Sequence, residues 1–175
     1  MEQLVTGLQY LSILAFCFAV VHAAFSDMFS LQIPNADSII IFIVFLPAAL
    51  ISGMPIISIA AHYGIALLVF CVGVVIYANG ITGAGDVKFL SAICVWWELH
   101  QLGKYLILVA LLGGILGAII LLARRFQNVR RLLPWMADST SMTQPVPYGI
   151  AIAGAVPFMF GTLSILPSSL SDLIR

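Results

Sequence analysis

The segment IISIAAHYGIALLVFCVGVVIYA, residues 56–78, carries no charged side chain and is bounded by Pro55 and by Asn79-Gly80. A helix needs about 20 apolar residues to cross a hydrocarbon core about 30 Å thick, so this segment predicts a transmembrane helix. The whole chain of 175 residues has the same character, because 62% of it is hydrophobic and only 8% is charged. Soluble proteins carry about 25% charged residues. The composition therefore excludes a soluble globular domain and indicates an integral membrane protein.

Hydropathy and turn-forming residues divide the chain into six predicted spans, so the expected fold is an all-α bundle of six transmembrane helices. The bundle is expected to form a single domain over residues 1–175. Lys88, Glu98 and His100 leave the fourth span with a short apolar centre, although Lys88 can snorkel from the helix start. The six spans are expected at residues 4–25, 37–53, 56–78, 86–102, 104–123 and 147–166.

The basic residues predict how the bundle is oriented. With six crossings, the loops after the first, third and fifth spans share one face, and both termini lie on the other. The first face carries Lys88 and four arginines of the 124–146 loop, whereas the second carries Lys104 and Arg175. Because cytoplasmic loops are enriched in Lys and Arg, the first face is expected in the cytoplasm and both termini outside.

Two carboxylates fall at similar depth on the predicted cytoplasmic face. Asp27 ends the first span and Asp86 begins the fourth. A charged residue in a membrane helix costs about 2.5–3.5 kcal/mol on insertion scales, so each is a candidate functional residue. Two aspartates on different helices can share a proton, so that one activates water while the other polarises a scissile carbonyl. The pattern is typical of an aspartyl protease.

The remaining polar residues receive structural interpretations. Asp37 is expected to cap the second span, although a contribution to the site stays open. Trp96 and Trp97, beside Glu98, are expected as anchors at the membrane interface. The three cysteines form no CxxC pair and the histidines lack a ligand-like spacing, so neither a metal nor another cofactor is expected. A net charge of zero gives no indication of a nucleic-acid partner.

Three segments resemble the type IV prepilin peptidase family, which consists of polytopic membrane aspartyl proteases of the GxGD type. Residues 27–35, Asp-Met-Phe-Ser-Leu-Gln-Ile-Pro-Asn, keep the family's spacing from the aspartate to Ile-Pro-Asn. Residues 83–88, Gly-Ala-Gly-Asp-Val-Lys, keep Gly-x-Gly-Asp with the following Val-Lys. Residues 147–151, Pro-Tyr-Gly-Ile-Ala, are similar to the family's proline–glycine element before its last helices. The resemblance covers nearly the whole chain.

The resemblance implies a peptidase of the bacterial inner membrane that cleaves the basic leader from prepilins or pilin-like proteins on the cytoplasmic side. It implies that Asp27 and Asp86 are catalytic. It also gives candidates for shaping the site or binding substrate, namely Gly83, Gly85, Lys88, Pro34, Asn35, Pro147, Tyr148 and Gly149. Purely structural roles are the alternatives. Gly83 and Gly85 could simply make the helix start flexible, Pro34 and Asn35 could simply end a helix, and Lys88 could snorkel to lipid headgroups.

The chain departs from the larger, bifunctional members of that family. It lacks their added segment with paired cysteines, so N-methylation of the product is not expected, and it resembles the small members that serve tight-adherence (Flp-type) pili. The segment between Asp27 and Ile33 also lacks the usual basic residues.

The alternative function is a small ion- or proton-coupled transporter, which predicts polar residues through the bilayer centre. The sequence identifies neither the substrate nor the oligomeric state.

Overall fold

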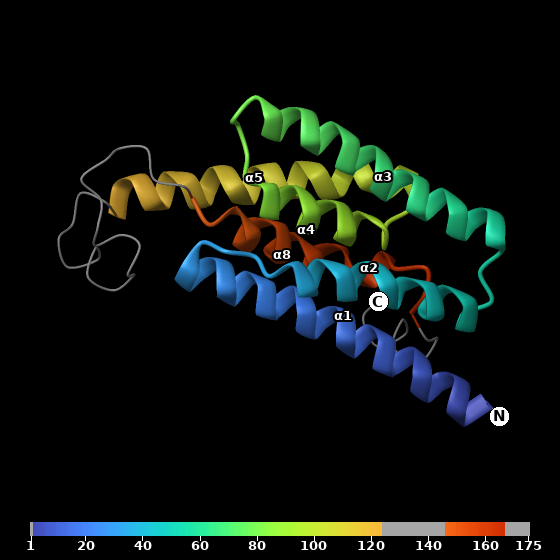
Figure 1. The fold of residues 1–175 in the computed structure, drawn as a ribbon. Helices are drawn as coiled ribbons and strands as arrows, with labels where there is room; N and C mark the ends of the chain where they lie inside the picture. Colours follow the sequence, from blue (N-terminus) through green and yellow to red (C-terminus); the bar gives the residue numbers. More distant parts are fainter. Residues whose placement is uncertain (1, 124–145, 167–175) are drawn as a thin grey trace.

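The computed structural model describes residues 2–123 and 146–166, which form helices joined by short connections (Figure 1). In these residues no strand occurs, so the prediction of an all-α fold is confirmed. The helices are α1 (Glu2–Ser30), α2 (Asn35–Ile51), α3 (Ile56–Ala78), α4 (Ala84–Cys94), α5 (Leu99–Ala123) and α8 (Tyr148–Met159), the last followed by the 3-10 turn η1 (Phe160–Thr162).

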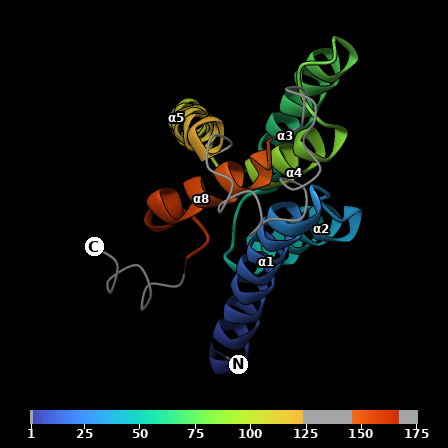
Figure 2. The same ribbon diagram turned by 90° about the vertical axis from the view of Figure 1, so that its left-hand side faces the viewer.

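Helices α4 and α8 lie at the centre of the bundle. Helix α4 packs against α2, α3 and α8, while α8 packs against α1, α4 and α5. The end view in Figure 2 shows the α1–α2 pair, α3 and α5 arranged around these two helices. The starts of α4 and α8 and the end of α1 therefore meet at one end of the bundle (Figure 1).

Three helices are long and apolar enough to cross a membrane, namely Val5–Ser30, Ile56–Ala78 and Leu99–Leu122. Two further apolar segments, Asn35–Ile51 and Tyr148–Thr162, are shorter. The prediction of six full spans is therefore confirmed only in part. The protein is helical, and three of its helices are clearly membrane-spanning. The third predicted span, 56–78, coincides with α3, which is flanked by Pro55 and Asn79.

The predicted fourth span, 86–102, is wrong in its extent. Helix α4 ends at Cys94 and α5 begins at Leu99. In the turn between them, His62 Nδ1 lies 2.8 Å from the carbonyl oxygen of Val95, which gives this carbonyl a partner outside the helix. Gly103, which lies between the predicted fourth and fifth spans, is inside α5. A helical glycine costs only about 1 kcal/mol relative to alanine, so the surrounding apolar helix continues through it.

The two tryptophans of this turn are buried, which corrects the expectation of interfacial anchors. Trp96 is 1% exposed and Trp97 is fully buried. The indole N–H of Trp96 donates to the carbonyl of Ile41 in α2 at 3.0 Å. The Trp97 ring packs against Tyr105 of α5, with centroids 5.4 Å apart. The pair therefore fixes the α4–α5 turn to the core of the bundle.

Asp37 does not cap α2, contrary to the sequence-based expectation. The helix begins at Asn35 after Pro34, and no side chain caps it. Asp37 is buried, and its Oδ2 lies 2.9 Å from Nδ1 of His22 in α1. Burying a carboxylate without a partner is costly, and here the partner comes from another helix. Local sequence rules for helix ends do not reveal such a contact.

This contact between His22 and Asp37 gives a stability prediction. His22→Ala leaves the buried Asp37 carboxylate unpaired, which is expected to lower the free energy of unfolding by about 1–3 kcal/mol. The control is His100→Ala, because the His100–Glu98 pair is largely exposed and exposed pairs contribute about 0–1 kcal/mol. Thermal unfolding of the purified variants in one detergent measures both effects. Equal stability of the two variants would contradict a role for His22 in joining α1 to α2.

Candidate active site

Asp27 is positioned by the last turn of α1. The helix continues to Ser30, past the predicted end at residue 25, so Asp27 lies within the helix rather than after it. The chain then leaves the helix through Leu31, whose φ of 54° lies in the left-handed region. Asp27 is 4% exposed. Its Oδ2 accepts a hydrogen bond of 2.7 Å from the backbone N–H of Gly149, at the start of α8.

Asp86 lies in the first turn of α4 and is half-buried. Its Oδ2 accepts a hydrogen bond of 3.3 Å from the backbone N–H of Gly83, so the carboxylate caps the start of its own helix. The side chain of Thr82 also hydrogen-bonds the Asp86 carboxyl.

Ile33, in the α1–α2 connection, lies between the starts of the two central helices. A Cβ atom at Gly149 would lie 2.9 Å from Cδ1 of Ile33, and one at Gly85 would lie 3.4 Å from its Cβ. Each glycine thus allows the connection to approach, which a larger residue would hinder. Asp27 and Ile33 both lie against Gly149, and Ile33 also lies against Gly85, the residue before Asp86. The structure therefore brings together the two aspartates that the sequence predicts as a pair.

Tyr148 faces the same cavity as Asp86. Both residues line a small cavity of about 120 Å³ between α3, α4, α5 and α8. The Tyr148 ring packs directly over Gly113 of α5, where a Cβ atom would clash with it. Pro147 immediately precedes α8 and is buried. The Pro-Tyr-Gly element thus contributes a cavity wall through Tyr148 and a hydrogen-bond donor through Gly149.

Lys88 and Asn35 form a separate pair at the edge of this end of the bundle. Lys88 Nζ donates to Asn35 Oδ1 at 3.0 Å, and both side chains are exposed. Lys88 lies two residues after Asp86, which corresponds to about 200° around a helix, so it faces away from Asp86. In the described residues, the ion pairs involve only His22–Asp37 and His100–Glu98, so Lys88 has no carboxylate partner there. Pro34 precedes the first residue of α2.

Two contributions to the site were not assigned from the sequence. Ile33 was noted only for spacing, yet its side chain separates the starts of α4 and α8. Thr82 directly precedes the Gly-x-Gly-Asp element, and its side chain hydrogen-bonds Asp86. A hydroxyl so close in sequence to a candidate catalytic carboxylate was the signal that could have identified Thr82. Over the part of the chain that the structure describes, no three His, Cys, Asp or Glu residues cluster as metal ligands.

Comparison of the sequence with known proteins identifies the family of the chain. Residues 14–122, more than half of the chain, match the model of the Type IV leader peptidase family. The matched region includes both Asp27 and Asp86. Searches of curated proteins and of solved structures found no significant match. The chain belongs to the type IV leader peptidase family and is a peptidase of the membrane.

Proposed function

We propose that the protein is an aspartic endopeptidase of the bacterial inner membrane that removes the leader from prepilins or pilin-like proteins. The observation that supports this proposal is that Asp27 of α1 and Asp86 of α4 lie at one junction around Ile33, in a member of the leader peptidase family. Family membership favours this function over an ion- or proton-coupled transporter.

The proposed mechanism uses the two carboxyl groups as one acid–base unit. The ionised aspartate takes a proton from water, whose oxygen attacks the carbonyl carbon of the scissile bond. The protonated aspartate donates to the carbonyl oxygen, and the tetrahedral intermediate then collapses as the leaving nitrogen takes a proton. The N–H of Gly149 keeps Asp27 oriented throughout. The two titration steps belong to the pair rather than to either residue.

We further propose that the chain passes six times between the ends of the bundle, with the aspartates facing the cytoplasm and both termini outside. Two observations support this path. Ile33 of the α1–α2 connection lies against Gly85 at the start of α4, so these two connections share one end. Ser52 and Met54 of the α2–α3 connection line a cavity of about 420 Å³ together with Glu98 of the α4–α5 turn, so those share the other.

The proposed orientation predicts a labelling pattern. In a background without Cys17, Cys71 and Cys94, Asn79→Cys is expected to react with an impermeant maleimide only after the membrane is opened. His100→Cys is expected to react in intact spheroplasts. Both positions are exposed, so a difference between them reports sidedness rather than burial. The reverse pattern would place the aspartates outside the cytoplasm and contradict the proposed site of cleavage.

Reconstitution tests the activity itself. The purified protein in liposomes is expected to shorten a purified prepilin by its leader, as measured by the intact mass of the product. We propose that the product carries a free amine, so the product mass should equal that of the trimmed chain even when S-adenosylmethionine is added. A product heavier by one CH₂ group would contradict the peptidase-only proposal, and an unprocessed prepilin would contradict the proposed substrate.

A further inference from the structure

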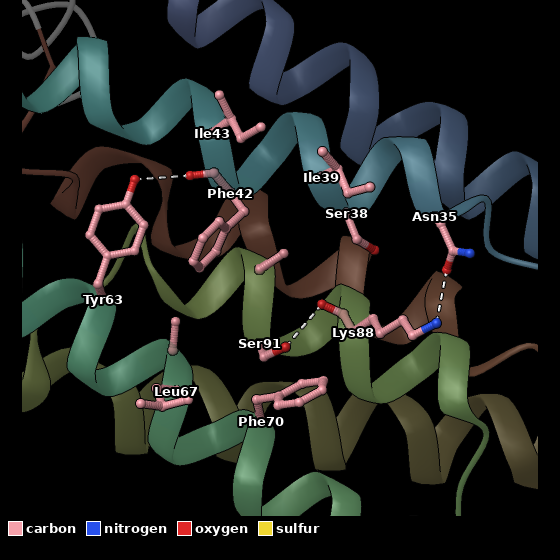
Figure 3. A pocket seen from close by; sticks show the side chains of 12 residues that line it. Asn35, Ser38, Ile39, Phe42, Ile43, Tyr63, Leu67, Phe70, Lys88 and Ser91 are labelled. Atoms are coloured by element: carbon pink, nitrogen blue, oxygen red, sulfur yellow. Dashed lines mark hydrogen bonds between the residues drawn. The ribbon is translucent and has the colours of Figure 1, made fainter.

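A groove runs between α2 and α3 on the side of α4 that carries Lys88. It has a volume of about 650 Å³ and is floored by α4. Its walls are apolar along most of their length, with Phe42 on α2 and Leu67 and Phe70 on α3 among the residues that line them (Figure 3). The hydroxyl of Tyr63 donates to the carbonyl of Phe42 at 3.1 Å, which joins the two walls at one end.

The other end of the groove is polar and positively charged. Lys88, Asn35 and Ser38 line it, and Figure 3 shows the Lys88 side chain reaching along α4 to Asn35. Asn35 is a neutral partner, so it orients the ammonium group without neutralising its charge. Because the Asn35 oxygen accepts this bond, its amide N–H groups stay available to donate. A cation with two neighbouring polar groups is complementary to a phosphate.

The groove faces the region that lipid tails occupy. Helix α3 is one of the three helices that can span a membrane, and Leu67 on its groove wall is exposed, as is Ile39 on α2. The polar end lies at the same end of the bundle as Asp86, only two residues from it in α4. An apolar groove with a basic group at one end, between membrane helices, matches the two parts of an anionic phospholipid.

We propose that this groove binds one anionic phospholipid, with its phosphate against Lys88 and Asn35 and an acyl chain along the apolar walls. A groove of about 650 Å³ is typical of small-ligand sites, and the lysine at one end favours a ligand that carries an anionic headgroup. This inference does not depend on the proposed proteolytic activity.

Native mass spectrometry of the full chain in detergent tests the phosphate contact. The probes are phosphatidylglycerol and, as the zwitterionic control, phosphatidylcholine with the same acyl chains. Wild type is expected to retain phosphatidylglycerol preferentially. Lys88→Gln is expected to weaken its binding about fivefold, and to weaken phosphatidylcholine binding less, because the choline ammonium offsets the charge of the phosphate. Lys104→Gln, which changes an exposed lysine outside the groove, is expected to leave binding unchanged. Equal losses in the two lysine variants would overturn the proposal.

A second pair of variants tests the acyl-chain contact. Leu67→Trp narrows the groove and is expected to lower the binding of both lipids. Leu68→Trp, at the adjacent and similarly exposed position outside the groove, is expected to bind like wild type. Competition separates the other occupants. If inorganic phosphate alone displaces phosphatidylglycerol, the assignment to lipid is wrong. The assignment is also wrong if a prepilin helix displaces the lipid equally well from Lys88→Gln and from wild type.

Discussion

Asp27→Asn and Asp86→Asn are each expected to lower the rate of leader cleavage by about 100- to 10,000-fold, the usual contribution of a positioned acid–base group. Asparagine has nearly the same shape as aspartate and can accept the same backbone hydrogen bonds, from Gly149 at position 27 and from Gly83 at position 86. It cannot take up or release the proton. The loss is therefore expected in the turnover rate rather than in membrane insertion.

The measurement is the initial rate of prepilin processing by purified variants in liposomes, at equal amounts of folded enzyme. Glu98→Gln is the matched control, because it neutralises a carboxylate near the opposite end of the bundle, where Glu98 pairs with His100. That variant is expected to keep wild-type activity. Near-normal processing by either aspartate variant would show that the two carboxyl groups do not act together as acid and base.

Gly149→Ala is expected to lower cleavage by about 10- to 100-fold. A Cβ atom at this position would lie 2.8 Å from Oδ2 of Asp27 and 2.9 Å from Cδ1 of Ile33. The first atom belongs to a candidate catalytic group, so relieving the contact moves either the carboxylate or the start of α8. Misplacing a reacting group by about 1 Å can cost about 100-fold in rate.

The same helix provides the control for this variant. At Gly154 an added Cβ would meet Leu112 at 3.7 Å, which is ordinary van der Waals contact, so Gly154→Ala is expected to retain activity. Unfolding temperatures of both variants separate a loss of function from a loss of stability. If Gly149→Ala cleaves prepilin at the wild-type rate with an unchanged fold, the N–H of Gly149 does not set the position of Asp27.

The sequence predicted the features that depend on one helix or on the order of helices. Helix α3 was placed correctly because an apolar run ends sharply at Pro55 and Asn79. The meeting of Asp27 and Asp86 was expected because the path of the chain brings the end of one helix beside the start of another. Neither conclusion requires knowledge of which side chains touch.

The features that the sequence did not predict depend on contacts between distant residues. The α4–α5 turn was misplaced because Trp96 and Trp97 resemble interfacial residues until their partners Ile41 and Tyr105 are known. Asp37 resembled a helix cap because its His22 partner lies in another helix. Tertiary packing sets the positions of the two tryptophans and of Asp37. Hydropathy and turn preferences do not report such contacts.

The shortness of α4 affects how water reaches the aspartates. Its 11 residues extend about 16 Å, roughly half the thickness of the hydrocarbon core. The ends of α1 and α5 extend beyond its start (Figure 1). The chain returns from α3 to that start through residues 79–83, where the N–H groups of Asn79, Gly80 and Ile81 donate to carbonyls of α3. The start of α4, with Asp86 in its first turn, is therefore set back from the ends of its neighbours, and we expect the water needed for cleavage to enter from that end of the bundle.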